Sequence, residues 1–130
     1  MEKITRVLSI FSLAVAMAFV PPKHSITGRW KIFVPEGISV HEYVELKKDG
    51  SYDVYVDGQI QERGFYNLKN SVFSIRNAKP VCGDGYWGKY KLDFHGRDSI
   101  HFTLIEDSCS NRRMDIVGVN PGLRRIREKL

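Results

Sequence analysis

Apolar and polar residues alternate along two neighbouring stretches in the second half of the chain. From Tyr86 to Phe94 and from Ile100 to Leu104, large apolar groups recur at every second position, and mostly polar residues lie between them. This period of two is typical of half-buried β-strands, and residues 95–98, His-Gly-Arg-Asp, form a turn sequence. Placing Phe94 opposite Ile100 puts the apolar groups of both stretches on one face. The pattern therefore predicts an antiparallel hairpin with this register.

The only two cysteines of the chain, Cys82 and Cys109, flank this hairpin. Continuing the register brings Cys109 opposite Gly85, and a turn over residues 82–85 folds the first thiol back toward the second. We therefore predict a Cys82–Cys109 disulfide at the open end of the hairpin. The alternative is a pair of free, buried thiols, which an oxidising compartment disfavours.

Further alternating stretches precede the hairpin and predict five more strands. They are Thr27–Val34, Ser39–Lys47, Ser51–Val56, Gln59–Leu68 and Val72–Arg76.

Asp-Gly pairs on both sides of the third stretch predict tight hairpin turns. At Asp49-Gly50, a three-residue bulged loop places Val44 opposite Val54 and keeps the apolar faces together. The same device at Asp57-Gly58 places Tyr52 opposite Glu62.

A last strand is predicted from Arg113 to Val119, with Met114 and Ile116 facing inward. Residues 123–130 form either a short strand or one helical turn. Eight strands joined by short turns indicate an all-β fold, an eight-stranded antiparallel up-and-down barrel, since a jelly roll or open sandwich needs longer connections.

The N-terminus has the three parts of a secretory signal. A short charged head is followed by an apolar run from Val7 to Ala18 that ends in the small-residue spacing of a cleavage site. We predict a signal peptide over residues 1–18, a leader over 19–25 and one barrel domain over 26–130. An uncleaved anchor is the alternative. No cysteine lies near the cleavage point for a lipid anchor, so the mature protein is expected to be secreted or periplasmic, with no membrane span.

The charge of the mature chain is modest. Removing the signal leaves 18 basic residues against 14 acidic ones, a net charge of +4. These charges are spread over predicted outer faces without a recognition helix, so we expect no binding of nucleic acid. A chain of this size has one core, and we expect a monomer.

Two groups of residues resemble sequences of small bacterial lipocalin-like proteins of the calycin group. One is Gly28-Arg29-Trp30 in the first strand. The other is Gly88-Lys89-Tyr90 with Asp93, followed by residues 107–112, Asp-Ser-Cys-Ser-Asn-Arg. The resemblance implies that a basic residue near the C-terminus, Arg124 or Arg125, packs over Trp30 next to Gly28. The chain is short for a lipocalin, which argues against a deep cavity.

No residue pattern indicates an enzyme, a cofactor or a metal site. The four histidines lack metal-ligand spacing, and no serine lies in a nucleophile motif. The candidate ligand-binding residues are instead polar groups on predicted inner faces: Glu42, Tyr52, Glu62, Tyr66 and Tyr90. Their alternative role is structural, with the glutamates bound by tyrosines or an arginine, or else exposed to water at the barrel rim.

Two functions are consistent with these features. One is a secreted or periplasmic carrier of a small, hydrophobic or amphipathic ligand. The other is an interaction module for an extracytoplasmic protein, such as an enzyme inhibitor, that uses the loop 35–40 or an outer face with Tyr43 and Trp87.

Overall fold

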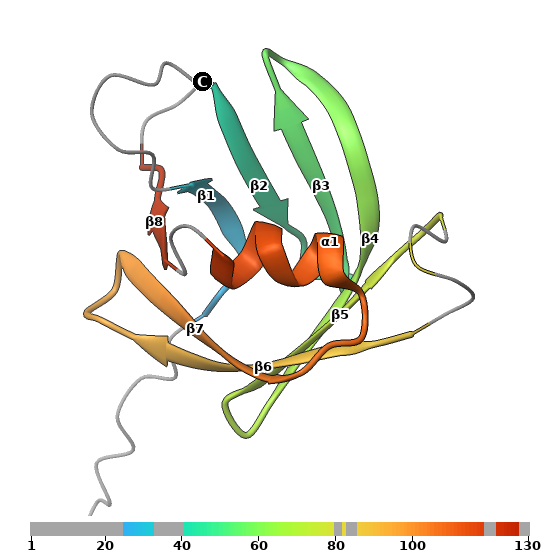
Figure 1. Ribbon diagram of the computed structural model, residues 1–130. Helices are drawn as coiled ribbons and strands as arrows, with labels where there is room; N and C mark the ends of the chain where they lie inside the picture. The colour runs from blue at the N-terminus through green and yellow to red at the C-terminus, as the bar shows by residue number, and fades with distance from the viewer. Residues whose placement is uncertain (1–24, 33–40, 80–81, 83–85, 119–121, 128–130) are drawn as a thin grey trace, which may run out of the picture.

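The computed structural model of the protein describes residues 25–32, 41–79, 82, 86–118 and 122–127. It is a closed barrel of eight antiparallel strands in which each strand pairs with its neighbours in sequence and the last pairs with the first (Figure 1). The strands are β1 (Gly28–Ile32), β2 (Glu42–Leu46), β3 (Ser51–Val56), β4 (Gln59–Lys69), β5 (Val72–Asn77), β6 (Gly88–Phe94), β7 (Ser99–Glu106) and β8 (Gly122–Arg125). The predicted all-β, up-and-down barrel is thus confirmed. The predicted signal peptide, most of the leader and the loop 35–40 lie outside the described residues.

The two hairpins with Asp-Gly turns differ from each other. Between β2 and β3, Val44 lies opposite Val54, as the bulged loop predicts. Between β3 and β4 the prediction is wrong, because Asp57 and Gly58 both have positive φ, 50° and 79°, which is the backbone of a two-residue turn. The bulge instead lies between Val54 and Tyr55.

The displaced bulge changes which residues face the interior. Tyr52 lies opposite Gly64, not opposite Glu62, which pairs with Val54. Ile60 lies opposite Tyr55 and is 38% exposed. Glu62 remains on the inner face, so the candidate site keeps this carboxylate.

The hairpin of β6 and β7 has the predicted register over most of its length. Phe94 lies opposite Ile100, and the pairing continues to Tyr90, opposite Leu104. A bulge between Tyr90 and Lys89 then shifts the register, and Lys89 lies opposite Glu106. The predicted extension of the ladder toward the cysteines is therefore wrong, and Gly85 itself lies outside the described residues. The Cys82–Cys109 disulfide is nevertheless present, with the two Cα atoms 5.3 Å apart.

A short helical segment replaces the strand predicted over residues 113–119. The helix α1 (Ser110–Arg113) continues into a π-helical turn, η1 (Met114–Gly118), and the eighth strand is β8. The short apolar run around Ile116 fits a helix as well as a strand, and only packing distinguishes them. In the helical form Ile116 and Val117 both contact the core, while Met114 is 59% exposed.

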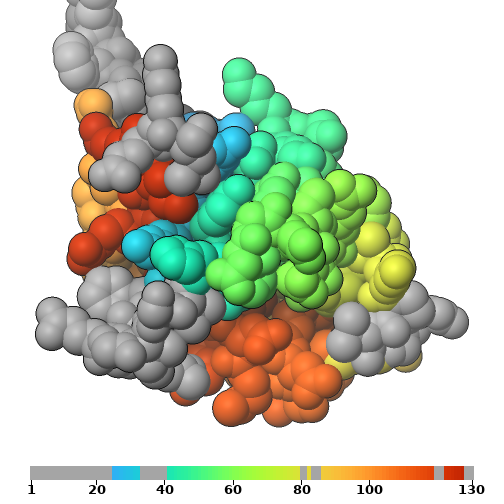
Figure 2. Space-filling model, turned by 90° about the horizontal axis from the view of Figure 1, so that it is seen from above, coloured from blue at the N-terminus to red at the C-terminus, as the bar shows by residue number. Residues whose placement is uncertain are grey.

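In the ribbon view the helical segment lies between β2–β4 and β6–β7, and in the space-filling view it forms a surface next to the green strands β3 and β4 (Figures 1 and 2). The segment from residue 123 lies within β8, so the strand alternative for its start is confirmed.

The pairing of β8 with β1 closes the barrel around Trp30. Arg125 lies opposite Trp30 on the inner face, and its guanidinium stacks over the fully buried indole with 4.2 Å between the guanidinium carbon and the ring centroid. The same guanidinium donates hydrogen bonds to the backbone carbonyls of Thr27 and Ser25. The expected basic contact with the tryptophan is thus confirmed for Arg125, whereas Arg124 lies opposite Lys31 on the outer face.

Aromatic and aliphatic side chains pack the interior. The buried core residues are Ile26, Trp30, Leu46, Tyr52, Phe73, Ile75, Tyr90, Leu92, Ile100 and Phe102. Rings of Tyr66, Phe73, Phe102 and Tyr90 contact one another in sequence across the barrel, with centroids 5.1 to 6.4 Å apart. In the part of the chain that the structure describes, no helix has the length and apolarity to cross a membrane.

Candidate functional site

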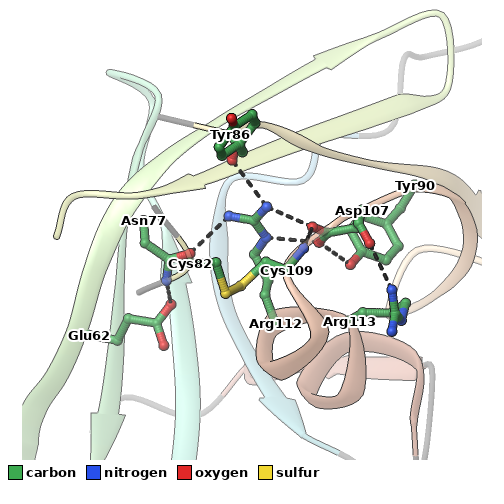
Figure 3. Close-up of a disulfide and its surroundings, with 9 residues drawn as sticks. All are labelled: Glu62, Asn77, Cys82, Tyr86, Tyr90, Asp107, Cys109, Arg112 and Arg113. Atoms are coloured by element: carbon green, nitrogen blue, oxygen red, sulfur yellow. Dashed lines mark hydrogen bonds and ion pairs between the residues drawn. A yellow bond between two sulfur atoms is a disulfide. The ribbon is translucent and has the colours of Figure 1, made fainter. Parts of the chain in front are cut away.

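A buried arginine, Arg112, is the centre of a polar network between the helical segment and the barrel. Its Nε and Nη2 donate to the two carboxylate oxygens of Asp107 at 2.8 and 2.7 Å. Its Nη1 donates to Oδ1 of Asn77 at 2.9 Å, and Nη2 also donates to the backbone carbonyl of Tyr86 at 3.0 Å (Figure 3). The side chain of Arg112 is only 7% exposed, so the guanidinium depends on these four acceptor contacts to replace its water.

Asp107 is bound from three sides. Besides the two bonds from Arg112, it accepts a hydrogen bond from the Tyr90 hydroxyl at 2.5 Å and one from the backbone N–H of Cys109 at 2.9 Å. Burial disfavours the charged form of Asp107, but the bonds from Arg112 and Tyr90 outweigh it and hold the pKa of Asp107 below its ordinary value. Burial and the neighbouring Asp107 raise the pKa of Tyr90. The ionised aspartate is thus a built-in counterion of the arginine.

The late group of residues that resembles lipocalin-like sequences meets at this network. A Cβ atom on Gly88 would lie 2.3 Å from Oδ2 of Asp107, so only glycine leaves room for the aspartate at this position of β6. Cys109 follows Asp107 by two residues and carries the disulfide, and Arg112 belongs to the first helical turn after it. The spacing of this group therefore reflects a structural junction, and Tyr90 serves in it as a structural residue.

Glu62 is also bound within the barrel. The Tyr52 hydroxyl donates to Oε1 of Glu62 at 2.8 Å, and the side-chain amide of Asn77 donates to the same oxygen. Burial, and then the charge and hydrogen bond of Glu62, raise the pKa of Tyr52. Because Asn77 also accepts from Arg112, the network runs without a break from Tyr52 to Asp107. Tyr66, another candidate, donates instead to the backbone carbonyl of Lys47.

Replacing Glu62 by glutamine is expected to lower the free energy of unfolding by about 1 to 3 kcal/mol, because a neutral amide accepts more weakly from two part-buried donors than a carboxylate does. Chemical denaturation of both proteins measures the difference. Glu106→Gln, which removes a carboxylate from an exposed position of β7, is the matched control and is expected to stay within about 0.5 kcal/mol of the wild type. Equal stabilities for Glu62→Gln and wild type would contradict the structural role of Glu62.

Glu42 and Asp115 form the part of the site that the network leaves open. Glu42 begins β2 on the inner face, opposite Val56, and Asp115 lies in η1. Burial, together with the charges of Asp115 and Glu62, raises the pKa of the half-buried Glu42. Asp115 is an exposed residue of η1, and partial desolvation of its carboxylate raises its pKa. Within the described part of the chain, neither carboxylate has a hydrogen bond or an ion pair. Glu42 therefore lies within reach of the charges of Asp115 and Glu62, and of these three carboxylates only Glu62 accepts hydrogen bonds from protein donors in the described chain.

The ligand-binding role of the five residues stays a prediction, and the structure shows where they lie. Glu42 and Glu62 do share one end of the barrel interior, while Tyr52, Tyr66 and Tyr90 all bind protein groups. Asp115 was missed because the predicted strand over residues 113–119 placed Met114 and Ile116 inward. No local signal identified it, since a segment this short carries no clear helical period.

Among residues 25–32, 41–79, 82, 86–118 and 122–127, no three histidine, cysteine or acidic side chains are grouped to hold a metal ion. Comparison of the chain with protein-family models, with curated proteins and with solved structures finds no match.

Proposed function

We propose that this protein is an extracytoplasmic, lipocalin-like binding protein, not an enzyme, and that it holds a small amphipathic molecule at the end of the barrel near Glu42 and Asp115. The cationic or hydrogen-bond-donating head of the molecule faces these two carboxylates. Its apolar part lies against Val44 and Val54, which follow on the same inner face and line the way to the core. The closed up-and-down barrel and the Trp30–Arg125 contact support the lipocalin-like assignment, and the disulfide supports an oxidising compartment.

The observation that carries the proposal is the uncompensated pair of Glu42 and Asp115. The protein satisfies its other inward polar groups with its own donors, as the contacts of Tyr52, Glu62 and Asp107 show. A part-buried carboxylate beside two others costs stability unless a ligand compensates it. Carboxylates that lack donors from the protein itself are what a site for a positively charged ligand group requires.

The raised pKa of Glu42 fixes the sign of its effect on stability. A carboxyl group that binds its proton more tightly when folded favours the native state at low pH, and this contribution is lost as the pH rises through the folded pKa. At neutral pH the ionised group is therefore a cost. Glu42→Gln should leave the stability at pH 7 equal to or above that of the wild type.

Binding of amphipathic probes tests the proposal. Octylamine is expected to bind at least about tenfold more tightly than octanoate or octanol, because only the ammonium head offsets the charge of the two carboxylates. Glu42→Gln and Asp115→Asn should each remove most of this preference without loss of stability. Isothermal titration calorimetry at pH 7 measures the three affinities for each protein.

Glu45→Gln is the matched control, since Glu45 lies on the same strand but pairs with Arg29 on the outer face. It should bind octylamine as the wild type does. Equal affinity for amine and carboxylate heads, or an amine preference that survives the double substitution at Glu42 and Asp115, would refute the proposed site.

A further inference from the structure

The geometry points to a docking surface on the outside of the barrel, where Arg76 lies between two half-exposed aromatic rings and has no acidic partner among the described residues. We propose that this arginine platform, made of Phe65, Arg76 and Trp87, binds a protein segment that presents an aspartate or glutamate carboxylate to the guanidinium. This inference concerns the outer face of the barrel wall and does not depend on the proposed ligand site.

The platform is a row across three elements. Phe65 on β4 is the direct cross-strand partner of Arg76 on β5. Trp87 immediately precedes Gly88, whose partner is Ile75, so the tryptophan continues the row on the other side of Arg76. The guanidinium carbon of Arg76 lies 5.1 Å from the Phe65 ring centroid and 5.3 Å from that of Trp87. Both contacts are within the range of a cation-π interaction, so the rings hold the guanidinium in place.

The platform combines aromatic exposure with an unsatisfied donor. Phe65 and Trp87 are each 42% exposed, and Tyr86 beside them is 60% exposed. Nε of Arg76 is buried and has no hydrogen-bond partner within the described chain, which is unusual for a guanidinium nitrogen. Arginine, tryptophan and tyrosine are the residues that dominate the energetics of protein interfaces.

Two other arginines on the outer face show what Arg76 lacks. Arg29 pairs with Glu45 at 3.5 Å while its guanidinium also lies over Tyr43. Arg63, on the same strand as Phe65, pairs with the buried Asp53 at 3.2 Å. In the described residues, Arg76 has the rings but no carboxylate. The missing component is therefore an acid, and a partner can supply it.

Charge around the platform favours an acidic partner. Arg63, two residues before Phe65, shares the single carboxylate of Asp53 with Lys47, so this group keeps one net positive charge. Lys89, two residues after Trp87, lies opposite Glu106, and Lys79 follows β5. Because Nε is buried, a carboxylate that reaches Arg76 pairs with the two terminal nitrogens of the planar guanidinium and also gains this positive field. Apolar side chains next to the acid in the partner would cover Phe65 and Trp87.

Selection from a phage-displayed library of random linear peptides on the folded protein tests the inference. Peptides with Asp or Glu next to an aromatic or apolar residue should be enriched. Synthetic versions should perturb the fluorescence of the exposed Trp87, since the only other tryptophan, Trp30, is fully buried. Changing the acid of such a peptide to its amide should weaken binding at least about tenfold.

Protein variants separate this surface from general charge attraction. Arg76→Gln and Trp87→Ala should each weaken the peptides at least about tenfold, and Arg76→Lys should do so while keeping the charge, because lysine lacks the planar fork. Arg97→Gln removes the same charge from an exposed turn residue and should bind as the wild type does. Circular dichroism shows which variants are folded. If Arg76→Gln does not fold, Arg76→Lys alone tests the role of the guanidinium.

Several results would overturn the inference. They are a selection that enriches no acidic peptides, peptides that bind Arg76→Lys and wild type equally, and an equal loss of binding in Arg97→Gln. Self-association of the wild type that Arg76→Gln abolishes in sedimentation measurements would show instead that the platform binds a second copy of the chain.

Discussion

Replacing Asp107 by asparagine is expected to lower the free energy of unfolding by about 3 to 5 kcal/mol, which is a large loss for a single substitution. The change keeps the size of the side chain but removes the counterion of Arg112, which is buried and has four bonds in fixed positions. A buried charge whose partner is removed retains its desolvation cost and loses its compensation. Chemical denaturation at pH 7 measures the loss.

The pH dependence of stability provides an independent check of this result. The pKa of Asp107 is lower in the folded state, so the ion pair stabilises the protein at neutral pH and this contribution is lost as the pH falls below the ordinary aspartate pKa of about 3.9. The Asp107→Asn variant lacks this contribution at any pH. The difference between the two proteins should therefore shrink in acid.

Asp98→Asn is the matched control for Asp107→Asn. Asp98 pairs with Arg127 at 2.6 Å and more distantly with Arg125 at 3.8 Å, but its side chain is 45% exposed, and the loss should stay below about 1 kcal/mol. Similar losses at Asp98 and Asp107 would contradict the assignment of Asp107 as the counterion of a buried arginine. Replacement of the pair together, as Asp107→Leu with Arg112→Met, should cost less than Asp107→Asn alone because no charge is left buried.

Removing the disulfide is expected to lower the free energy of unfolding by about 3 to 4 kcal/mol in the chain-entropy model. The bond joins residues 27 positions apart, and the loop that it closes contains all of β6 and β7. Without it the unfolded chain regains this freedom, and the start of α1 loses its covalent link to the residues after β5. Thermal unfolding of the Cys82→Ser, Cys109→Ser double variant should have a midpoint lower by on the order of 10 °C.

A reducing agent distinguishes the covalent bond from the packing of the two side chains. It should lower the midpoint of the wild type toward that of the double variant and leave the double variant unchanged. Two titratable thiols in folded wild-type protein that has been exported from its host, or a midpoint that ignores reduction, would contradict the prediction.

The polar groups of the barrel interior and of the adjoining helical segment fall into two classes with different consequences for function. Tyr52, Glu62, Asn77, Arg112 and Asp107 bind one another, so substitutions among them should act on stability. Glu42 and Asp115 have no such partners in the described chain, and their substitutions should act on binding. The separation of these two responses is the main experimental test of the proposed ligand site.

The sequence by itself determined the fold class, the central hairpin and the disulfide. Alternation from Tyr86 to Leu104 favours one register, because it places the apolar groups of both strands on one face and a shift of one residue would put the two sets on opposite faces. The cysteines at the two ends of that hairpin then had only each other as partners. These features were predictable because they follow from local period, turn residues and a single pair of thiols.

The tertiary structure decided what depends on contacts between distant segments. The Asp57-Gly58 sequence suits either a three-residue bulged loop or a two-residue turn. The structure has the two-residue turn, with a bulge between Val54 and Tyr55, because this register pairs β3 with β4 along its length. The helical form of residues 110–118 is stabilised by distant contacts. It lets Arg112 bind Asp107 and Asn77 while Ile116 packs on the core.

The same dependence on distant contacts explains the two residues that the sequence left undecided or missed. Arg125 rather than Arg124 covers Trp30, because the pairing of β8 with β1 turns only the former inward. Asp115 approaches Glu42 across a separation of more than half the chain, and that proximity arises only when the helical segment packs against the closed barrel. Local sequence sets which residues alternate between the two faces, but only the closed barrel brings these two acids together.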